Sequence, residues 1–396
     1  MDGAPCSSKR PNGRRLGIEP RAAAIRYNRN PFRNQAYVDM SSSEQSPAIV
    51  QAAREFVEPA AGLDLHSTGA RLRYTDGTLE VQLAYPLGAA AAELQAGLAA
   101  ALGLGVQNIQ VRTQVDSSAV QQNVKPIQGI KNILVVASGK GGVGKSTTAA
   151  NLALALAHDG AQVGLLDADI YGPSQASMMG LSGQRPSSSD GKTFAPLIAH
   201  GVKVMSIGLL VDEEQPMVWR GPMVTQALTQ LLNDCRWGEL DYLVVDMPPG
   251  TGDIQLTLSQ RVPVSGAVIV TTPQDIALLD ARKGLKMFEK VGVPVLGIIE
   301  NMSTHICSNC GHEEHVFGAG GGARMAAQYG VDLLAELPLD IRIREQADDG
   351  KPTVAADPAG KLAQAYLSMA RRTSARLARH AAQIAKPMPS IEIEAS

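Results

Sequence analysis

Short apolar runs alternate with longer amphipathic stretches through residues 131–372 of this chain. Runs of about six residues that are apolar on both faces are typical of strands in a parallel sheet, and longer amphipathic stretches are typical of helices. The runs are NILVVAS, QVGLLDAD, VKVMSIG, YLVVDMPP, GAVIVTTP and VLGIIEN. Their alternation with helices predicts an α/β domain built on a doubly wound, mostly parallel sheet.

Residues 47–115 carry a different pattern, which predicts a small N-terminal α/β domain. AIVQAAREFV and AAAAELQAGLAAALG have the period of short helices, and ARLRYTDGTLEVQLAY predicts two strands joined at Asp76-Gly77. NIQVRT predicts a closing strand. The polar stretch at 116–130 is then a linker to the large domain.

The two ends of the chain show no apolar period. Residues 1–46 hold seven arginines among Pro, Asn and Gly, and we expect a disordered leader. An Arg-rich, acid-poor leader is compatible with a transit peptide, but an over-extended gene start with Met40 as the true initiator is the simpler interpretation. Residues 373–396 are basic and rich in alanine, and we expect a flexible tail.

Composition and charge narrow the class of protein. The chain has 44% hydrophobic residues, and its 36 basic and 38 acidic residues give a formal charge of -2. This balance provides no general attraction for nucleic acid or an anionic membrane. The sequence shows no apolar run near the roughly 20 residues that span a bilayer and no signal-peptide core. We therefore expect a cytoplasmic protein without a nucleic-acid partner or stable membrane insertion.

A glycine-rich stretch, ASGKGGVGKST, lies between the first predicted strand of the large domain and the helix that follows it. Glycines at this place let backbone N–H groups turn toward phosphates, and the helix N-terminus adds its dipole. Lys145 is expected to bridge the β and γ phosphates, and the Ser146 hydroxyl to reach Mg²⁺. The predicted nucleotide-binding residues of this loop are Gly139, Lys140, Gly141, Gly142, Val143, Gly144, Lys145, Ser146 and Thr147.

Three carboxylates follow predicted strands. Asp167 and Asp169 end one strand, and Asp246 ends another. The carboxyl ends of parallel strands meet at one sheet edge, so we expect all three near the phosphates. A carboxylate there can hold Mg²⁺ or orient the attacking water, but the spacing does not divide these roles between Asp167 and Asp169.

The early lysine of GKGGVGKST resembles the deviant Walker A motif of the SIMIBI ATPases, which include the nitrogenase iron protein and the partitioning ATPases. The resemblance implies that Lys140 reaches the phosphates of a second subunit and that Asp169 polarises the attacking water. It also implies that Asp167 and Asp246 serve Mg²⁺ and that Asn301, in IIENM, binds adenine. A solvated Lys140 and an Asn301 that only ends its strand are the plainer alternatives.

The last predicted strand is followed by a pair of cysteines, Cys307 and Cys310, with His312 and His315 close behind. Two residues between cysteines let both sulfurs face one metal. Two thiolates are too few for a [4Fe-4S] cluster, so either two chains contribute a pair each, or the histidines complete a Cys2His2 Zn²⁺ site. A thioredoxin-like redox pair is less compatible with the polar loop around it.

The two remaining cysteines do not complete a disulfide framework. Cys235 follows a predicted helix and is expected to be a buried structural thiol, and Cys6 lies in the leader.

Beyond the phosphate loop, several motifs resemble the Mrp/ApbC family of iron-sulfur cluster carrier ATPases. They are DADIYGPS, VWRGPM, DYLVVDMPPGTGD, IENMS and the cysteine pair followed by GHEEHVFGAGG. The resemblance runs from about residue 130 to 370. It implies a homodimer that binds ATP and Mg²⁺, receives a labile [4Fe-4S] cluster between two Cys307/Cys310 pairs, and works with scaffold and apo client proteins. The 47–115 unit resembles the small assembly domain of this family but lacks its cysteine in AYPLGAAA.

Two other functions remain open at this stage. A positioning ATPase of the septum-site or plasmid-partition kind shares the phosphate loop, but it leaves the cysteine pair without a role. A zinc-stabilised regulatory ATPase would use Cys307 and Cys310 for structure, and their loss would then destabilise the dimer.

Overall fold

The computed structural model describes residues 42–121, 124–210, 221–250, 252–307 and 309–384. The first helix, α1, spans Ser42–Glu55 and therefore begins inside the predicted leader. The rest of that leader, with Cys6 and Met40, lies outside the described residues, as does the first half of VWRGPM, residues 218–220.

An eight-stranded sheet has the order β15-β12-β11-β6-β10-β7-β9-β8. All its neighbouring strands are parallel except β8, which is antiparallel to β9 at the edge. The predicted doubly wound, mostly parallel sheet is thus confirmed. Its strands are β6 Ile130–Ser138, β7 Val163–Asp167, β8 Leu197–Ala199, β9 Val202–Ser206, β10 Leu240–Asp246, β11 Gly266–Thr271, β12 Val295–Glu300 and β15 Leu333–Glu336.

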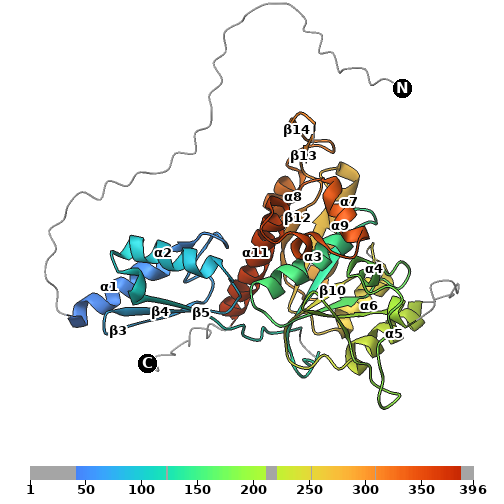
Figure 1. The fold of residues 1–396 in the computed structure, drawn as a ribbon, viewed down its shortest axis with the longest axis horizontal. Helices are drawn as coiled ribbons and strands as arrows, with labels where there is room; N and C mark the ends of the chain where they lie inside the picture. The colour runs from blue at the N-terminus through green and yellow to red at the C-terminus, as the bar shows by residue number, and fades with distance from the viewer. Residues whose placement is uncertain (1–41, 122–123, 211–220, 251, 308, 385–396) are drawn as a thin grey trace, which may run out of the picture. The chain divides into compact units, whose positions relative to one another are not determined.

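Helices cover both faces of this sheet (Figure 1). Leu134 and Val136 of β6 face the layer of α3, α10 and α11, whereas Ile133 and Val135 face the layer of α5 to α8. Both sets are buried, which is why the strand is apolar from Ile133 to Ala137. The helices are α3 Lys145–His158, α4 Gln175–Met178, α5 Gly221–Asp234, α6 Asp253–Arg261, α7 Asp275–Lys290, α8 Gly321–Tyr329, α9 Ile341–Asp348, α10 Thr353–Ala356 and α11 Lys361–Ile384, with the 3-10 turn η2 Ile207–Leu209.

The N-terminal part of the described chain forms a separate three-stranded sheet with the order β3-β4-β5. Asp76 and Gly77 turn the β3–β4 hairpin with φ of 50° and 76°, a left-handed conformation that an Asp-Gly pair tolerates. Leu79, Val81 and Leu83 of β4 point into its core with Leu94 and Leu98 of α2. The elements are β1 Val57–Glu58, β2 Leu63–Asp64, β3 Arg71–Thr75, β4 Thr78–Leu83, α2 Ala90–Leu102, η1 Val106–Asn108 and β5 Ile109–Thr113.

The C-terminal segment differs from the expected flexible tail. Helix α11 continues through Ile384, and Thr373 to Ala378 are buried within it. Arg376 is only 9% exposed because it bonds to the Ala61 carbonyl and to Asp332. The prediction that the tail begins at 373 is therefore wrong. Among the helices that the structure describes, none combines the length and apolar composition needed to cross a bilayer.

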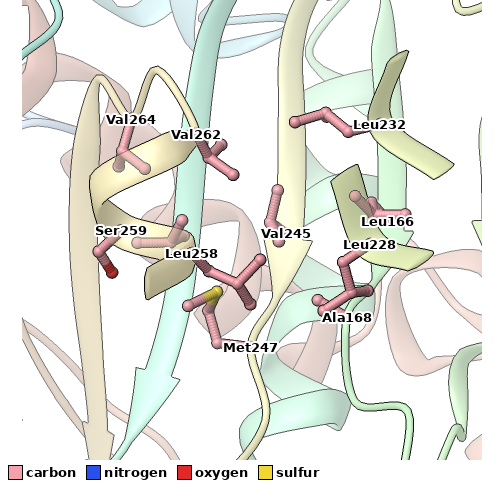
Figure 2. Close-up of a pocket in the computed structure, with 11 residues that line it drawn as sticks. Leu166, Ala168, Leu228, Leu232, Val245, Met247, Leu258, Ser259, Val262 and Val264 are labelled. Carbon is pink, nitrogen blue, oxygen red and sulfur yellow. The ribbon is translucent and has the colours of Figure 1, made fainter. Parts of the chain in front are cut away.

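A small closed cavity lies between the sheet and the layer of α5 and α6. Figure 2 shows Leu228 and Leu232 of α5, Leu258 of α6 and Val262, the residue after α6, around Val245. The cavity leaves about 10 Å³ for the centre of a water molecule, and the one side-chain polar atom along it, Ser259 Oγ, has no hydrogen-bond partner in the structure. Because a buried water needs about two to four polar partners, this space is dry.

Candidate functional site

The phosphate loop joins β6 to α3 at the centre of the sheet, where the strand order reverses. Gly142 and Gly144 have φ of 79° and 81°, the left-handed region that glycine adopts without strain. A Cβ at Gly139 would overlap the backbone of Asp280 in α7, and one at Gly144 would overlap the Asn301 amide. The loop therefore needs glycine at these positions.

Lys145 opens α3 and turns its ammonium inward. Its side chain is only 7% exposed, and Nζ is bonded to Asp246 Oδ1. Asp169 Oδ2 lies 3.9 Å from the same Nζ, and the Ser146 Oγ lies at 3.2 Å. The structure thus brings these predicted residues together around one buried cation. Lys140 is half-buried on the loop, and its carbonyl accepts a hydrogen bond from Ser138 Oγ at 2.9 Å.

Sheet register explains why the carboxylates meet. Asp246 of β10 stands directly beside Asp167 of β7, and both are fully buried. Burial raises the pKa of Asp167, and the neighbouring Asp246 raises it further. Burial also raises the pKa of Asp169, although Lys145 opposes that shift. Carboxylates crowded in this way favour a divalent cation beside them.

Asp167 is held by four donors. Its Oδ1 accepts from the Asp169 N–H at 3.1 Å, and its Oδ2 accepts at 3.0 Å from the Ser174 and Gln175 N–H groups and from Ser206 Oγ. Four hydrogen bonds hold the carboxylate in one orientation.

Gln175 is a site residue that belongs to no motif and carries no charge, so nothing in the sequence distinguished it. It is fully buried, and its Nε2 donates to Asp246 Oδ2 and to the Ser146 carbonyl, each at 2.9 Å. Gln175 Oε1 and Ser174 Oγ are buried and have no hydrogen-bond partner among the residues that the structure describes. The amide thus joins the Asp246 strand end to the phosphate loop.

Asn301 directly follows β12 and contacts the phosphate loop. Its Nδ2 donates to the Val143 carbonyl at 2.9 Å, and the residue is 7% exposed. This bond orients the Asn301 side chain toward the loop. The expected contact with adenine stays a prediction.

Cys307 and Cys310 lie on an excursion between β12 and α8, which we call the cysteine hairpin (residues 304–320). Its strands are β13 His305–Ile306 and β14 Glu313–Glu314, which pair antiparallel. The Cys307 N–H donates to the His312 carbonyl at 2.9 Å, and Gly311 turns back with φ of 70° to donate to the Cys307 carbonyl at 2.8 Å.

The two thiols have distinct surroundings. Backbone N–H groups of Cys310 and then Asn309 donate to the Cys307 sulfur and lower the pKa of this thiol. Cys310 is exposed and Cys307 partly exposed, so both sulfurs are accessible from outside. Cys235, in contrast, is buried as expected, and burial raises its pKa to about 12.

The histidines do not join the cysteines in the described structure. His315 Nδ1 lies 2.8 Å from the Ser303 carbonyl, to which it donates as the Nδ1–H tautomer. Within the described residues, no group of three or more Cys, His, Asp or Glu side chains is placed to hold one metal ion. A single described chain therefore assembles neither a Cys2His2 site nor a four-thiolate site.

The sheet, the phosphate loop and the cysteine hairpin occur together in a known family of proteins. The model of the NUBPL iron-transfer P-loop NTPases, a ParA group, matches residues 129–374. This chain belongs to that family. The match covers the eight-stranded sheet, the phosphate loop and the cysteine hairpin together.

Curated members of the family are similar over most of their own length. An iron-sulfur cluster carrier protein of Pseudomonas fragi is 61% identical over 269 residues, which cover 68% of this chain and 94% of that protein. The iron-sulfur cluster transfer protein NUBPL of Mus musculus is 53% identical over 270 residues, covering 68% and 84%. A nucleotide-binding protein of Archaeoglobus fulgidus, solved with ADP, is 39% identical with a TM-score of 0.51 and covers 56% of this chain and 88% of that one.

Proposed function

We propose that this protein is an ATP-dependent iron-sulfur cluster carrier. Two chains would hold a [4Fe-4S] cluster as cargo between their Cys307/Cys310 pairs and transfer it to apo-proteins. The observation that carries the proposal is an accessible pair of thiols, without a third ligand in the described part of one chain, on a hairpin that leaves the same sheet edge as the phosphate loop. Relatives named as carriers add support.

The number of ligands that a cluster needs favours a cluster shared by two chains. A [4Fe-4S] cluster is held by about four thiolates, and each hairpin supplies two. Accessible sulfurs also suit a cargo that must leave again, whereas structural zinc is held in a closed site of about four ligands. The lowered pKa of Cys307 favours the thiolate form that ligates iron.

The nucleotide site supplies the parts of a hydrolysis reaction. Lys145 would exchange its bond to Asp246 for the β and γ phosphate oxygens, and Lys140 of a second chain would add a further positive charge. Asp169 would orient the attacking water. Charge on the phosphate oxygens would then be balanced by groups that are already fixed in place, which is how phosphoryl transfer is accelerated.

The residues around Asp246 also fit the Mg²⁺ that accompanies ATP. Ser146 Oγ and the buried carboxylates of Asp167 and Asp246 are hard oxygen ligands, and the unpartnered Gln175 Oε1 and Ser174 Oγ can accept from the waters that Mg²⁺ retains. Bound Mg²⁺ would neutralise charge on the β and γ phosphates.

Anaerobic reconstitution with iron and sulfide tests the proposal. We expect visible absorption from about four irons per two chains, lost in Cys307→Ala/Cys310→Ala and kept in the matched control Cys235→Ala. The loaded protein should restore the activity of an apo iron-sulfur acceptor, and the rate of transfer should change when ATP is added.

The alternatives predict different results. Tightly held zinc with no chromophore, together with dissociation of dimers of the double variant, would support a structural metal in its place. ATP-dependent binding to vesicles with no iron uptake would support a positioning ATPase.

A further inference from the structure

Four residues at the end of β12 lie between the phosphate loop and the cysteine hairpin. This linking segment, residues 300–303, bonds to the loop through Asn301 Nδ2 and the Val143 carbonyl. Ser303 directly precedes the cysteine hairpin. Its carbonyl accepts a hydrogen bond from His315 Nδ1, which lies within the hairpin. One short piece of chain therefore contacts both parts of the candidate site.

Glu300 closes the base of the hairpin from inside the protein. The residue is fully buried, and its Oε1 accepts from Ser303 Oγ at 3.0 Å. Its Oε2 accepts from the N–H of Gly322, in the first turn of α8. A single carboxylate thus holds both ends of the excursion that carries Cys307 and Cys310.

The type of residue at position 300 matters for this contact. Each carboxylate oxygen accepts one of the two hydrogen bonds, so a side chain without oxygen at this position would leave the Gly322 N–H without this acceptor. No lysine or arginine of the described chain forms an ion pair with Glu300, so its bonds to Ser303 and Gly322 are what compensate its burial. A Cβ at Gly322 would stand 2.9 Å from Glu300 Cβ, so α8 approaches this closely only with glycine there.

The linking segment is also strained. Met302 has φ of 58°, a left-handed conformation that is unfavourable for a residue with a side chain. Backbone bonds on either side hold it there: Asn301 N–H to Thr271 O at 2.8 Å, and Ser303 N–H to Leu337 O at 2.9 Å. This turn allows Asn301 to face the phosphate loop while Ser303 faces the hairpin. Strained residues held in this way concentrate at functional and switching sites.

We propose that Glu300 is a positioning residue that couples the cysteine hairpin to the phosphate loop, so that nucleotide at the loop changes the accessibility of Cys307 and Cys310. A nucleotide that moves the Val143 carbonyl moves Asn301, and the rigid turn at Met302 passes the displacement to Ser303, Glu300 and the hairpin base. The proposal rests on the proposed function only in requiring that nucleotide binds the loop.

The test measures thiol alkylation in the metal-free full-length protein. Under anaerobic conditions, the rate at which N-ethylmaleimide modifies the peptide that contains Cys307 and Cys310 is followed by mass spectrometry, with and without Mg²⁺ and the non-hydrolysable analogue AMP-PNP. We expect the nucleotide to change this rate by about fivefold in the wild-type protein, a typical size for coupling between two sites.

Glu300→Met keeps roughly the length of the side chain but removes both oxygen acceptors. It should bring the ratio of the two rates close to one, while the affinity for a fluorescent ATP analogue stays near the wild-type value. Glu314→Met makes the same chemical change at an exposed position of the hairpin and should keep the wild-type ratio. Ser303→Ala removes one of the two bonds and leaves Gly322 in contact, so it should lower the ratio in part. It decides the question if Glu300→Met does not fold.

A wild-type ratio of one would overturn the coupling, and so would a wild-type ratio retained in Ser303→Ala and in any Glu300→Met protein that folds. The alkylation rate is measured without iron, so the result does not depend on the carrier function. A protein that binds a cluster but shows no nucleotide effect on alkylation refutes only the coupling. One that shows the effect but never binds a cluster refutes only the carrier proposal.

Discussion

At the scale of single residues, the most informative group is the Lys145 ammonium, which Asp246 and Asp169 surround in a buried site. A buried cation must be paired, because an isolated charge in the interior is costly. Phosphate oxygens are equivalent partners for it. We therefore expect the site to be organised before nucleotide arrives, and the phosphates to replace Asp246 as the partner of Lys145.

Gln175 provides a prediction at the same scale. Its amide orients Asp246 and the Ser146 carbonyl, and partners of this kind around a metal ligand typically contribute about tenfold or more in metal affinity. Gln175→Ala should raise the Mg²⁺ concentration needed for half-maximal ATP hydrolysis about tenfold. A Mg²⁺ titration of the hydrolysis rate measures this. Gln184→Ala, exposed nine positions further along the chain, is the control, and equal Mg²⁺ requirements in both variants would contradict the role.

At the scale of elements, α11 is attached to the sheet by charge as well as by its apolar face. Arg376 Nη2 lies 3.3 Å from Asp332 Oδ1, and Arg379 bonds to Oδ2. Burial raises the pKa of Asp332, but the two arginines outweigh it, and the pKa ends below its usual value. A group with a lowered folded pKa stabilises the protein above its unfolded pKa and loses that effect as the pH falls through the folded value.

Asp332→Asn should therefore lower the free energy of unfolding by about 1 kcal/mol at pH 7. The difference from wild type should shrink below about pH 4, the ordinary value for aspartate, and vanish once the pH is below the folded pKa. Urea unfolding across this range measures it. Asp349→Asn, at an exposed position directly after α9, is the control and should leave the free energy of unfolding close to the wild-type value. A difference for Asp332→Asn that grows as the pH falls would contradict the assignment.

The dry cavity under α5 and α6 leads to a second prediction at this scale. Val245→Ile adds one methylene toward the empty space in Figure 2 and should raise the free energy of unfolding by about 0.5 kcal/mol. Val270→Ile makes the same change on the other face of the sheet, which is fully packed, and should lower it by about 1 kcal/mol. Chemical denaturation compares the two. A loss of stability in Val245→Ile would show that the cavity cannot accommodate the methylene.

The elements also show why some features were predictable from sequence and others were not. Strands such as β6 and β11 are apolar on both faces, and that pattern alone located them. The last part of α11 carries Thr373, Ser374 and Arg376, which suggested solvent, yet all three residues are buried. The two hydroxyls donate to carbonyls one turn earlier in the helix, and Arg376 donates to distant partners, the Ala61 carbonyl and Asp332. Gln175 and Glu300 escaped notice for the same reason, since their partners come together only in the fold.

At the scale of the whole molecule, the described part of one chain carries two of the four thiolates that a cluster needs. Lys140 lies on the loop without an ion pair to the described part of its own chain. Both features are explained if the functional unit is a pair of chains related by two-fold symmetry, in which the same surface of each chain faces the other.

A mixing experiment tests this pairing. Lys140→Ala and Asp169→Asn should each abolish ATP hydrolysis alone. If Lys140 acts on the partner's nucleotide, a mixed dimer has one complete site, formed by the phosphate loop and Asp169 of the first variant and by Lys140 of the second. Random exchange makes half of the dimers mixed, so an equal mixture should recover about one quarter of the wild-type rate. If Lys140 acts within its own chain, both sites of every dimer lack one group and the mixture stays inactive. Mixing Lys140→Ala with Lys145→Ala is the informative companion, because Lys145 belongs to the same site as Asp169 and should give the same recovery.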